Sequence, residues 1–182
     1  MKCRKKVIAV CILACIVLVA YMARFNYVNG QFPKSKLCVI KAGEAAEKNG
    51  LKYSVISGDI MTGADYIEKY GDEDSFEADD QVLIVYLDVE NTTSETQKMG
   101  AAEMIAKCGV WANGVEYNSL WFVNDETFDD TIGSGKKERV GITANINSNL
   151  KNIMKNGNEW RIEISGWPNR IELVVPMNGG KG

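Results

Sequence analysis

The chain contains no histidine among its 182 residues. Histidine is the usual general base near neutral pH and a frequent ligand of zinc. Its absence excludes His-ligated metal sites and nucleophiles activated by histidine, such as Ser-His and Cys-His pairs. No Cys-x-x-Cys pair is present either. We therefore expect a protein that is not an enzyme and that needs no cofactor.

Charged residues are also missing from residues 7–23, directly after a basic start, MKCRKK. As a helix these 17 residues would span about 25 Å, at the short end of what crosses a bilayer. Positive charge before the apolar run predicts that the N-terminus stays inside. We therefore expect a cytoplasmic tail at 1–6, a transmembrane anchor at 7–23 and a juxtamembrane stalk at 24–36, with the rest outside the cell membrane.

Two alternatives to an uncleaved anchor remain open. A signal peptide cut after Ala20 or Ala23 would place Leu18 or Tyr21 three residues before the cut, and both are too large for the usual small residue. A lipoprotein is suggested by residues 12–15, ILAC, which approximate a lipobox. However, the apolar run continues to residue 23, whereas a polar tether is typical after a lipidated cysteine. All three hypotheses place the remainder outside the cytoplasm.

The exported part is acidic. Residues 25–182 hold 16 basic and 24 acidic residues, a net charge of −8. Such a surface repels the phosphates of nucleic acid, so nucleic-acid binding is excluded as a function.

The strongest fold signal is residues 81–93, QVLIVYLDVENTT, which we predict to be the central strand of a sandwich. Side chains of a strand alternate between its two faces, so one face is wholly apolar: Leu83, Val85, Leu87 and Val89. The other face begins apolar and ends in two carboxylates. A buried helix is the competing interpretation of such a run. We expect the apolar half of the second face to be covered by a helix at 65–70 or by the N-terminal strand.

Further strands are predicted at 37–40, 51–61, 139–146, 160–164 and 170–175. Asn113-Gly114 predicts a hairpin turn between residues 110–111 and 115–117, with residues 120–123 continuing as a strand or as packing at the sheet edge. Short helices are predicted at 62–71 and 148–157, residues 43–50 as a polar turn or loop, and 101–107 as a helical turn or the lead into a strand. The fold class is therefore mainly β: an antiparallel, immunoglobulin-like sandwich of seven or eight strands over residues 37–176, with one or two short helices. Residues 177–182 form a flexible tail.

Three stretches carry a resemblance to a known family. They are the strand ending in asparagine at 83–93, the Gly-containing strand KKERVGI at 136–142, and ISGWP at 164–168 before the last strand. Over about residues 50–176 the chain resembles the telokin-like, immunoglobulin-like domains of uncharacterised anchored proteins and lipoproteins of Gram-positive bacteria. The resemblance implies a sandwich whose leading asparagine ends its strand, and it carries over no catalytic residues.

Three sets of residues are candidates for a site. Cys38 and Cys108, the two exported cysteines, are candidates for one disulfide, or for two separately buried thiols. Two acidic loops are rich in oxygen ligands and are candidates for Ca²⁺ sites. The alternative is that both loops are simply solvated, because neither has EF-hand spacing. The metal candidates in the first loop are Asp72, Asp74, Asp79 and Asp80, and the second loop holds Asp125, Glu126, Asp129 and Asp130. Aromatic residues are candidates for a platform that binds glycan or peptide, or are core residues: Trp111, Tyr117, Trp121 and Trp167.

The function we expect is a membrane-anchored interaction module that binds a protein or glycan at the cell surface. The alternatives are an enzyme or enzyme subunit acting on cell-wall polymer, and a Ca²⁺-dependent binding module.

Overall fold

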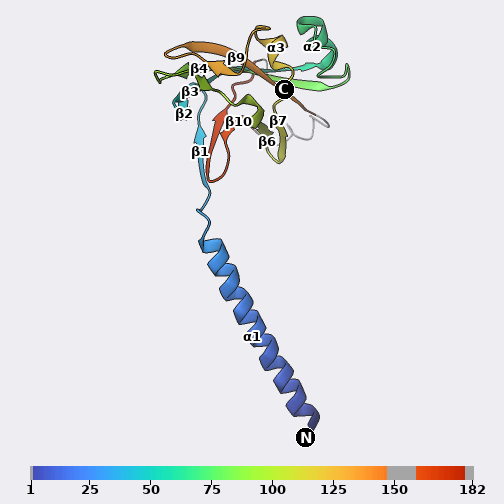
Figure 1. Cartoon of the computed structure of the whole chain (residues 1–182). Helices are drawn as coiled ribbons and strands as arrows, with labels where there is room; N and C mark the ends of the chain where they lie inside the picture. Colours follow the sequence, from blue (N-terminus) through green and yellow to red (C-terminus); the bar gives the residue numbers. More distant parts are fainter. Residues whose placement is uncertain (1, 147–158, 179–182) are drawn as a thin grey trace. The chain divides into compact units, whose positions relative to one another are not determined.

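The computed structural model of the chain describes residues 2–146 and 159–178, which fall in two compact units, Met1–Ser35 and Lys36–Gly182. The first unit is the helix α1 (Lys2–Gly30) (Figure 1). Its segment Cys11–Gly30 has a mean hydropathy of 1.9, and within the described residues it is the one helix long and apolar enough to cross a membrane. A signal sequence would meet the same criterion. The helix ends at Gly30 rather than residue 23, so much of the predicted stalk is helical.

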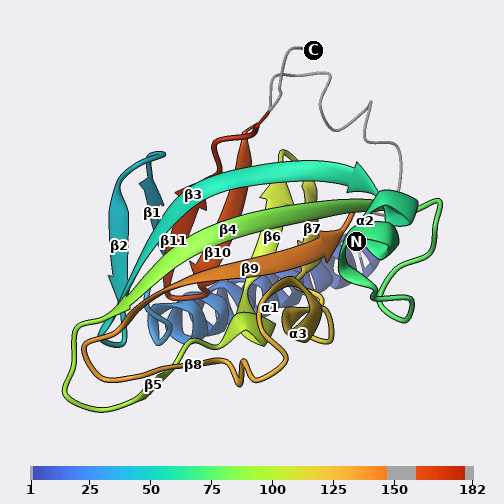
Figure 2. The same ribbon diagram turned by 90° about the horizontal axis from the view of Figure 1, so that it is seen from above.

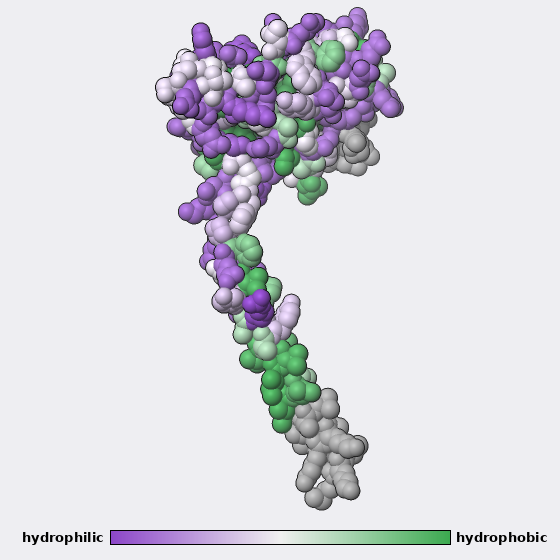
Figure 3. Space-filling model, in the orientation of Figure 1, coloured by the Kyte–Doolittle hydropathy of each residue, from purple (hydrophilic) through white to green (hydrophobic). Residues whose placement is uncertain are grey.

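Figure 3 shows the hydrophobic stretch of α1, and it shows a largely hydrophilic surface on the side of the second unit that is in view. The exposed hydrophobic side chains of α1 include Leu13, Val17 and Leu18, each more than 60% exposed. A helix with apolar residues on all sides is stable only when something apolar surrounds it. This pattern fits a segment that lies in a membrane.

The second unit is a sandwich of two sheets. The first sheet has the order β1 (Lys36–Ile40), β11 (Asn169–Val174), β10 (Trp160–Ser165), β6 (Ile105–Cys108) and β7 (Trp111–Gly114). The second has the order β2 (Ala45–Lys48), β3 (Leu51–Thr62), β4 (Gln81–Asn91) and β9 (Lys137–Asn145). All neighbours are antiparallel except β1, which pairs parallel with β11. The predicted mainly-β sandwich is therefore confirmed.

The strands β3, β4 and β9 of the four-stranded sheet cross over those of the five-stranded sheet, as Figure 2 shows. A separate two-stranded ladder joins β5 (Gln97–Lys98) to β8 (Thr131–Ile132) at one end of the sandwich. A single apolar core fills the space between the two large sheets.

β4 is central, as predicted from its alternation. The side chains of Leu83, Val85, Leu87 and Val89 are at most 1% exposed and belong to the main core. On its other face Val82 and Ile84 are also fully buried, in a smaller cluster with Tyr66 and Phe76. The cover is the helix α2 (Gly63–Tyr70), one of the two elements expected there.

The start and end of α2 follow from its sequence. The Thr62 side chain accepts a hydrogen bond from the Asp65 amide, which caps the first turn. Gly71 ends the helix in the left-handed conformation, at φ 72°, which a residue without a Cβ adopts without strain. At Gly63 a Cβ would lie 1.8 Å from the carbonyl oxygen of Glu77, so only glycine fits under this loop.

Several local predictions were wrong. Asn113 and Gly114 lie within β7, and the hairpin turn falls instead at Gly109-Val110, where Gly109 has φ 60°. This register places Trp111 against Trp160, with ring centroids 5.5 Å apart, so burial of two indoles fixed the turn rather than the Asn-Gly signal.

Residues 120–123 form a short helix, α3 (Leu120–Val123), rather than a strand, and residues 45–48 form β2 rather than a turn or loop. The stretch 101–107 contains both predicted forms, a 3-10 turn (Ala101–Glu103) that leads into β6. The predicted tail begins too early, because Met177 forms a bridge with Gly58 and the Asn178 amide donates to the Gly58 carbonyl. The helix predicted at 148–157 lies outside the described residues.

Asn91 holds together the end of β4 and the two-stranded ladder. Its side-chain amide donates to the carbonyls of Glu95 and Ile132, at 2.7 and 2.8 Å. Its side-chain oxygen accepts from the amide and the hydroxyl of Thr93. Asn91 is only 1% exposed, so these groups would otherwise be buried without partners.

We predict that Asn91→Ala lowers the free energy of unfolding by about 2–4 kcal/mol, because two backbone carbonyls lose their donor inside the protein. Urea denaturation followed by tryptophan fluorescence measures this loss. Asn118→Ala, at an exposed asparagine, serves as the matched control and should change stability by less than about 0.5 kcal/mol. Equal stabilities of the two variants would contradict the role assigned to Asn91.

Candidate functional site

The outer face of the five-stranded sheet carries an unusual number of charged residues. In β10 the buried Trp160, Ile162 and Ile164 point into the core, so the alternate residues Arg161 and Glu163 point outward. The same alternation turns Lys107 of β6, and Arg170 and Glu172 of β11, to this face. Because these strands are neighbours, the five side chains come together on one surface.

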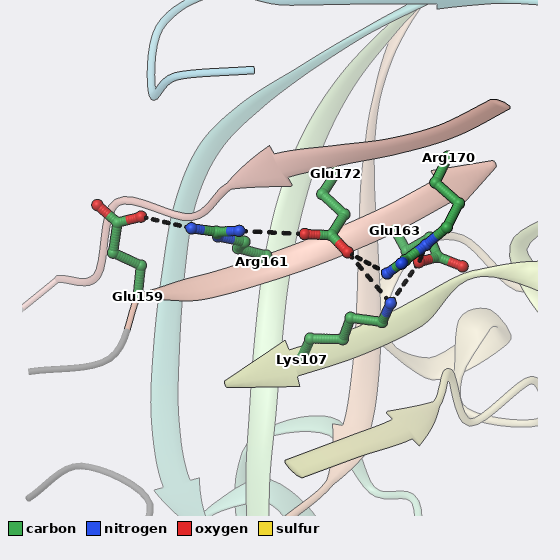
Figure 4. Close-up of polar contacts among 6 residues, drawn as sticks. All are labelled: Lys107, Glu159, Arg161, Glu163, Arg170 and Glu172. Carbon is green, nitrogen blue, oxygen red and sulfur yellow. Dashed lines mark hydrogen bonds and ion pairs between the residues drawn. The ribbon is translucent and has the colours of Figure 1, made fainter. Parts of the chain in front are cut away.

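Glu172 is the centre of this group, which Figure 4 shows together with Glu159. Its Oε1 accepts from the Lys107 ammonium at 3.2 Å and from the Arg170 guanidinium at 2.7 Å. Its Oε2 accepts from Arg161 at 3.2 Å. Glu163 pairs with Lys107 and, at 3.1 Å, with Arg170. We call these six residues the ionic network: Lys107, Glu159, Arg161, Glu163, Arg170 and Glu172.

The network is layered by exposure. The side chains of Glu163 and Glu172 are 8% and 5% exposed, so both carboxylates lie under the basic groups. Lys107, Arg161 and Arg170 are 21%, 32% and 34% exposed. The three basic side chains are therefore partly exposed to solvent, and the two carboxylates that bind them lie beneath them. Within the network only Glu159, at 58% exposure, is an exposed acid.

Burial alone would raise the pKa of Glu172. Hydrogen bonds from Lys107 and Arg161 and the charges of Lys107 and Arg170 outweigh burial, so the pKa lies below its ordinary value of 4.5. For Arg161, burial opposes the charged form, but hydrogen bonds to Glu159 and Glu172 raise the pKa further above its ordinary value. The groups are therefore held ionised at neutral pH and act as fixed charges.

A groove of about 400 Å³ opens beside the ionic network. One wall is charged and includes Lys107, Arg161 and Glu172, and the other is formed by Val110, Trp111 and Ala112 of the β6–β7 hairpin. Val110 at the tip of the hairpin is fully exposed. A volume of this size is typical of sites that hold a small ligand or a few units of a polymer.

The predicted aromatic platform does not exist as one surface. Trp111 lines the groove, whereas Tyr117 packs edge-on against Trp121 at 5.5 Å, beside α3. Trp167 is 56% exposed and follows the far end of β10, about 17 Å from the end that carries Trp160. The four candidates therefore lie in three places, and only Trp111 belongs to the groove.

Two of the acidic candidates, Asp72 and Asp80, accept hydrogen bonds within their own loop or from α2. Asp72 is fully buried, accepting from the Tyr66 hydroxyl at 3.0 Å and from the Ser75 amide, while Asp80 accepts from the Glu77 amide. In the part of the chain that the structure describes, no three acidic or cysteine residues come together to hold a metal ion. The predicted set Asp72, Asp74, Asp79 and Asp80 is therefore not a metal site.

In the second acidic loop Asp130 is buried at φ 61° and accepts from the amides of Gly100 and Ala101. It ties the loop before β8 to the start of the 3-10 turn. This role is also structural.

The predicted disulfide is not formed. Cys38 lies on β1 and Cys108 on β6, and β11 and β10 lie between these strands. Three strand spacings separate them by about 14 Å, twice the Cα distance that a disulfide tolerates. Cys38 is exposed, and Cys108 is buried.

The network was missed from the sequence, although a signal for it is present. Arg161-Ile162-Glu163 and Arg170-Ile171-Glu172 each alternate charge with an apolar residue inside a strand. Opposite charges on a strand's outer face often mark cross-strand pairs, but the partner strands must be known first. Lys107 gave no such signal.

No protein-family model matches the chain, and no curated protein sequence does. Among solved structures, the chain is similar to a functionally unknown protein from Listeria monocytogenes EGD-e, with a TM-score of 0.50 and 12% identity over 74% of this chain and 80% of that one. It is also similar to an uncharacterized beta-sandwich protein from Clostridium difficile 630, with a TM-score of 0.45 and 11% identity over 78% and 96% of the two chains. The first likeness, to a protein from a Gram-positive bacterium, supports the fold alone.

The lowered pKa of Glu172 predicts a dependence of stability on pH. A carboxylate whose pKa is depressed by folding stabilises the native state above its unfolded pKa, near 4.5, and this contribution is lost as the pH falls through the folded pKa. We expect Glu172→Gln to lower stability at pH 7 by about 3 kcal/mol, since three cations lose their buried partner. Its stability should also decline less steeply than that of the unmodified protein below pH 4.5.

Urea denaturation across pH 3–7 measures both effects, and Glu159→Gln is the control at an exposed acid of the same network. The control should lose at most about 1 kcal/mol at pH 7. A Glu172→Gln variant as stable as the control, with an unchanged pH profile, would show that the network does not hold the sheet.

Proposed function

We propose that the protein is a membrane-anchored, extracytoplasmic binding module without enzymatic activity, and that the groove beside the ionic network is its binding site. The observation that carries the proposal is the pairing of fixed charges with an exposed apolar wall in one groove. Binding sites commonly combine apolar area with a few polar groups held in place by neighbours. The expected partner is a protein or glycan at the cell surface.

The chemistry of the groove favours binding over catalysis. A general acid or base must exchange a proton near the working pH. Glu172 is held ionised by three cations, and Lys107 and Arg170 are each bound to two carboxylates. A carboxylate held ionised in this way is a weak base near neutral pH, whereas the paired side chains are positioned to orient a ligand.

Kinship with telokin-like, immunoglobulin-like domains is part of the same proposal. Two supports are the face-to-face sheets and Asn91, which ends β4 as the resemblance implies. Domains of this architecture serve many purposes, so the binding role depends on the groove and not on the fold.

We predict that a photoreactive amino acid at Ala112, exposed in the groove, cross-links to a defined partner in the native cell. The matched control places the same amino acid at Ala45, an exposed alanine on β2 of the other sheet. We expect cross-linked adducts from position 112 and none of these adducts from position 45. The adducts from position 112 should disappear when Val110→Asp is added. The same adducts at both positions would refute a role for the groove.

The proposed location is tested through the exposed Cys38. Intact cells are treated with a membrane-impermeant reductant and then with a membrane-impermeant maleimide. If the domain is outside, the full chain is labelled and Cys38→Ser abolishes the labelling, because Cys108 is buried and the remaining cysteines lie in α1. Labelling that requires cell lysis would place the domain inside.

A further inference from the structure

Arg161 joins the buried and exposed layers of the ionic network. Its Nη1 donates to Glu172 at 3.2 Å, and its Nη2 donates to Glu159 at 3.1 Å. The Glu172 side chain is 5% exposed, whereas that of Glu159 is 58% exposed. The first bond therefore fixes the guanidinium, and the second lies at the rim of the groove (Figure 4).

The two bonds differ in how readily they exchange. An exposed ion pair contributes little to stability because water and salt compete with it, so another anion can replace Glu159 at small cost. Replacing Glu172 would leave buried charges unpaired, which is costly. Only the place of Glu159 is open to a competitor.

The charge balance of the network predicts the sign of that competitor. Three cations, Lys107, Arg161 and Arg170, stand over two buried carboxylates, Glu163 and Glu172. One positive charge is left, and Glu159 neutralises it. A ligand that displaces Glu159 must therefore bring a negative charge of its own.

The surroundings indicate the rest of the ligand. Glu159 already shows that a carboxylate carried on a peptide chain reaches this guanidinium, where it accepts one hydrogen bond from Nη2. Val110 and Ala112, both exposed, line the same groove and offer apolar area beside the charge, whereas the indole of Trp111 packs inward on Trp160. A segment with an acidic residue next to an apolar one fits both features.

We propose that the groove binds an acidic peptide segment of a partner protein, whose carboxylate takes the place of Glu159 on Arg161 while a neighbouring apolar side chain packs against Val110 and Ala112. This inference rests on the proposed function and specifies its ligand. Glu159 is then an internal competitor that lowers the affinity of the groove for its partner.

The test uses the full chain in lipid nanodiscs and the fluorescein-labelled peptide acetyl-Ala-Glu-Leu-Ala, with acetyl-Ala-Gln-Leu-Ala as the uncharged probe. Fluorescence anisotropy measures the dissociation constant at low salt. We expect the Glu peptide to bind up to about fivefold more tightly than the Gln peptide, because the ion pair that it forms with Arg161 is as exposed as that of Glu159. Glu159→Gln should tighten binding of the Glu peptide by up to about fivefold, because the competitor loses its charge.

Three controls make the result specific. Glu47→Gln, at an exposed acid on β2, changes the net charge equally and should leave the affinity unchanged. Arg161→Gln should abolish the preference for the Glu peptide, with thermal melts checking that each variant remains folded. Inorganic phosphate serves as a competitor, and displacement of the peptide at lower concentrations than acetate requires would assign the groove to a phosphate ligand and overturn the proposal.

The proposal also fails if both peptides bind equally, or if Glu159→Gln weakens binding or leaves it unchanged. If the peptide-binding test fails but cross-linking remains specific to position Ala112, the acidic ligand is rejected and the groove is kept as a binding site. Loss of both results would reject the proposed function itself.

Discussion

Burial of β4 on both faces is the constraint on which the rest of the domain depends. One face supplies Leu83, Val85 and Leu87 to the core between the sheets, and the other is closed by Tyr66 of α2 and by Phe76 from the loop that follows α2. Because a strand covered on both sides cannot shift by one residue without exposing apolar groups, its register fixes those of β3 and β9. Both faces of β4 in the four-stranded sheet are therefore used for packing. The candidate site lies instead on the outer face of the five-stranded sheet.

That outer face is organised by charge rather than by apolar contact. Glu172 holds three cations in place and is itself kept ionised by them. Buried ion pairs are weak evidence for stability, since burying charges is costly, but they hold side chains in defined positions. Here the result is a groove in which Arg161 is fixed from below and presented to solvent beside Val110 and Trp111.

Much of the fold follows from the sequence. Apolar and alternating runs located β1, β3, β4, β9, β10 and β11, and a run with helical spacing that ends at Gly71 located α2. Local signals failed where distant contacts decided the outcome: the Asn113-Gly114 signal was overridden by packing of Trp111 on Trp160. The site could not be predicted, because its residues come from β6, β10 and β11 and meet only through sheet order. Trp111 was identified by residue type alone, and the acidic candidates proved to be structural partners such as Asp72 and Asp130.

The central claim is that Glu172 is a buried carboxylate, ionised at neutral pH, that anchors the cations of the groove. The most direct measurement is an NMR titration of the glutamate side-chain carboxyl carbons in the folded protein, with Glu172 assigned by comparison with Glu172→Gln. The account predicts a titration midpoint for Glu172 clearly below 4.5, the value of an unperturbed glutamate. A midpoint at or above that value would contradict it, because the cations would then not be bound to the carboxylate as the structure shows.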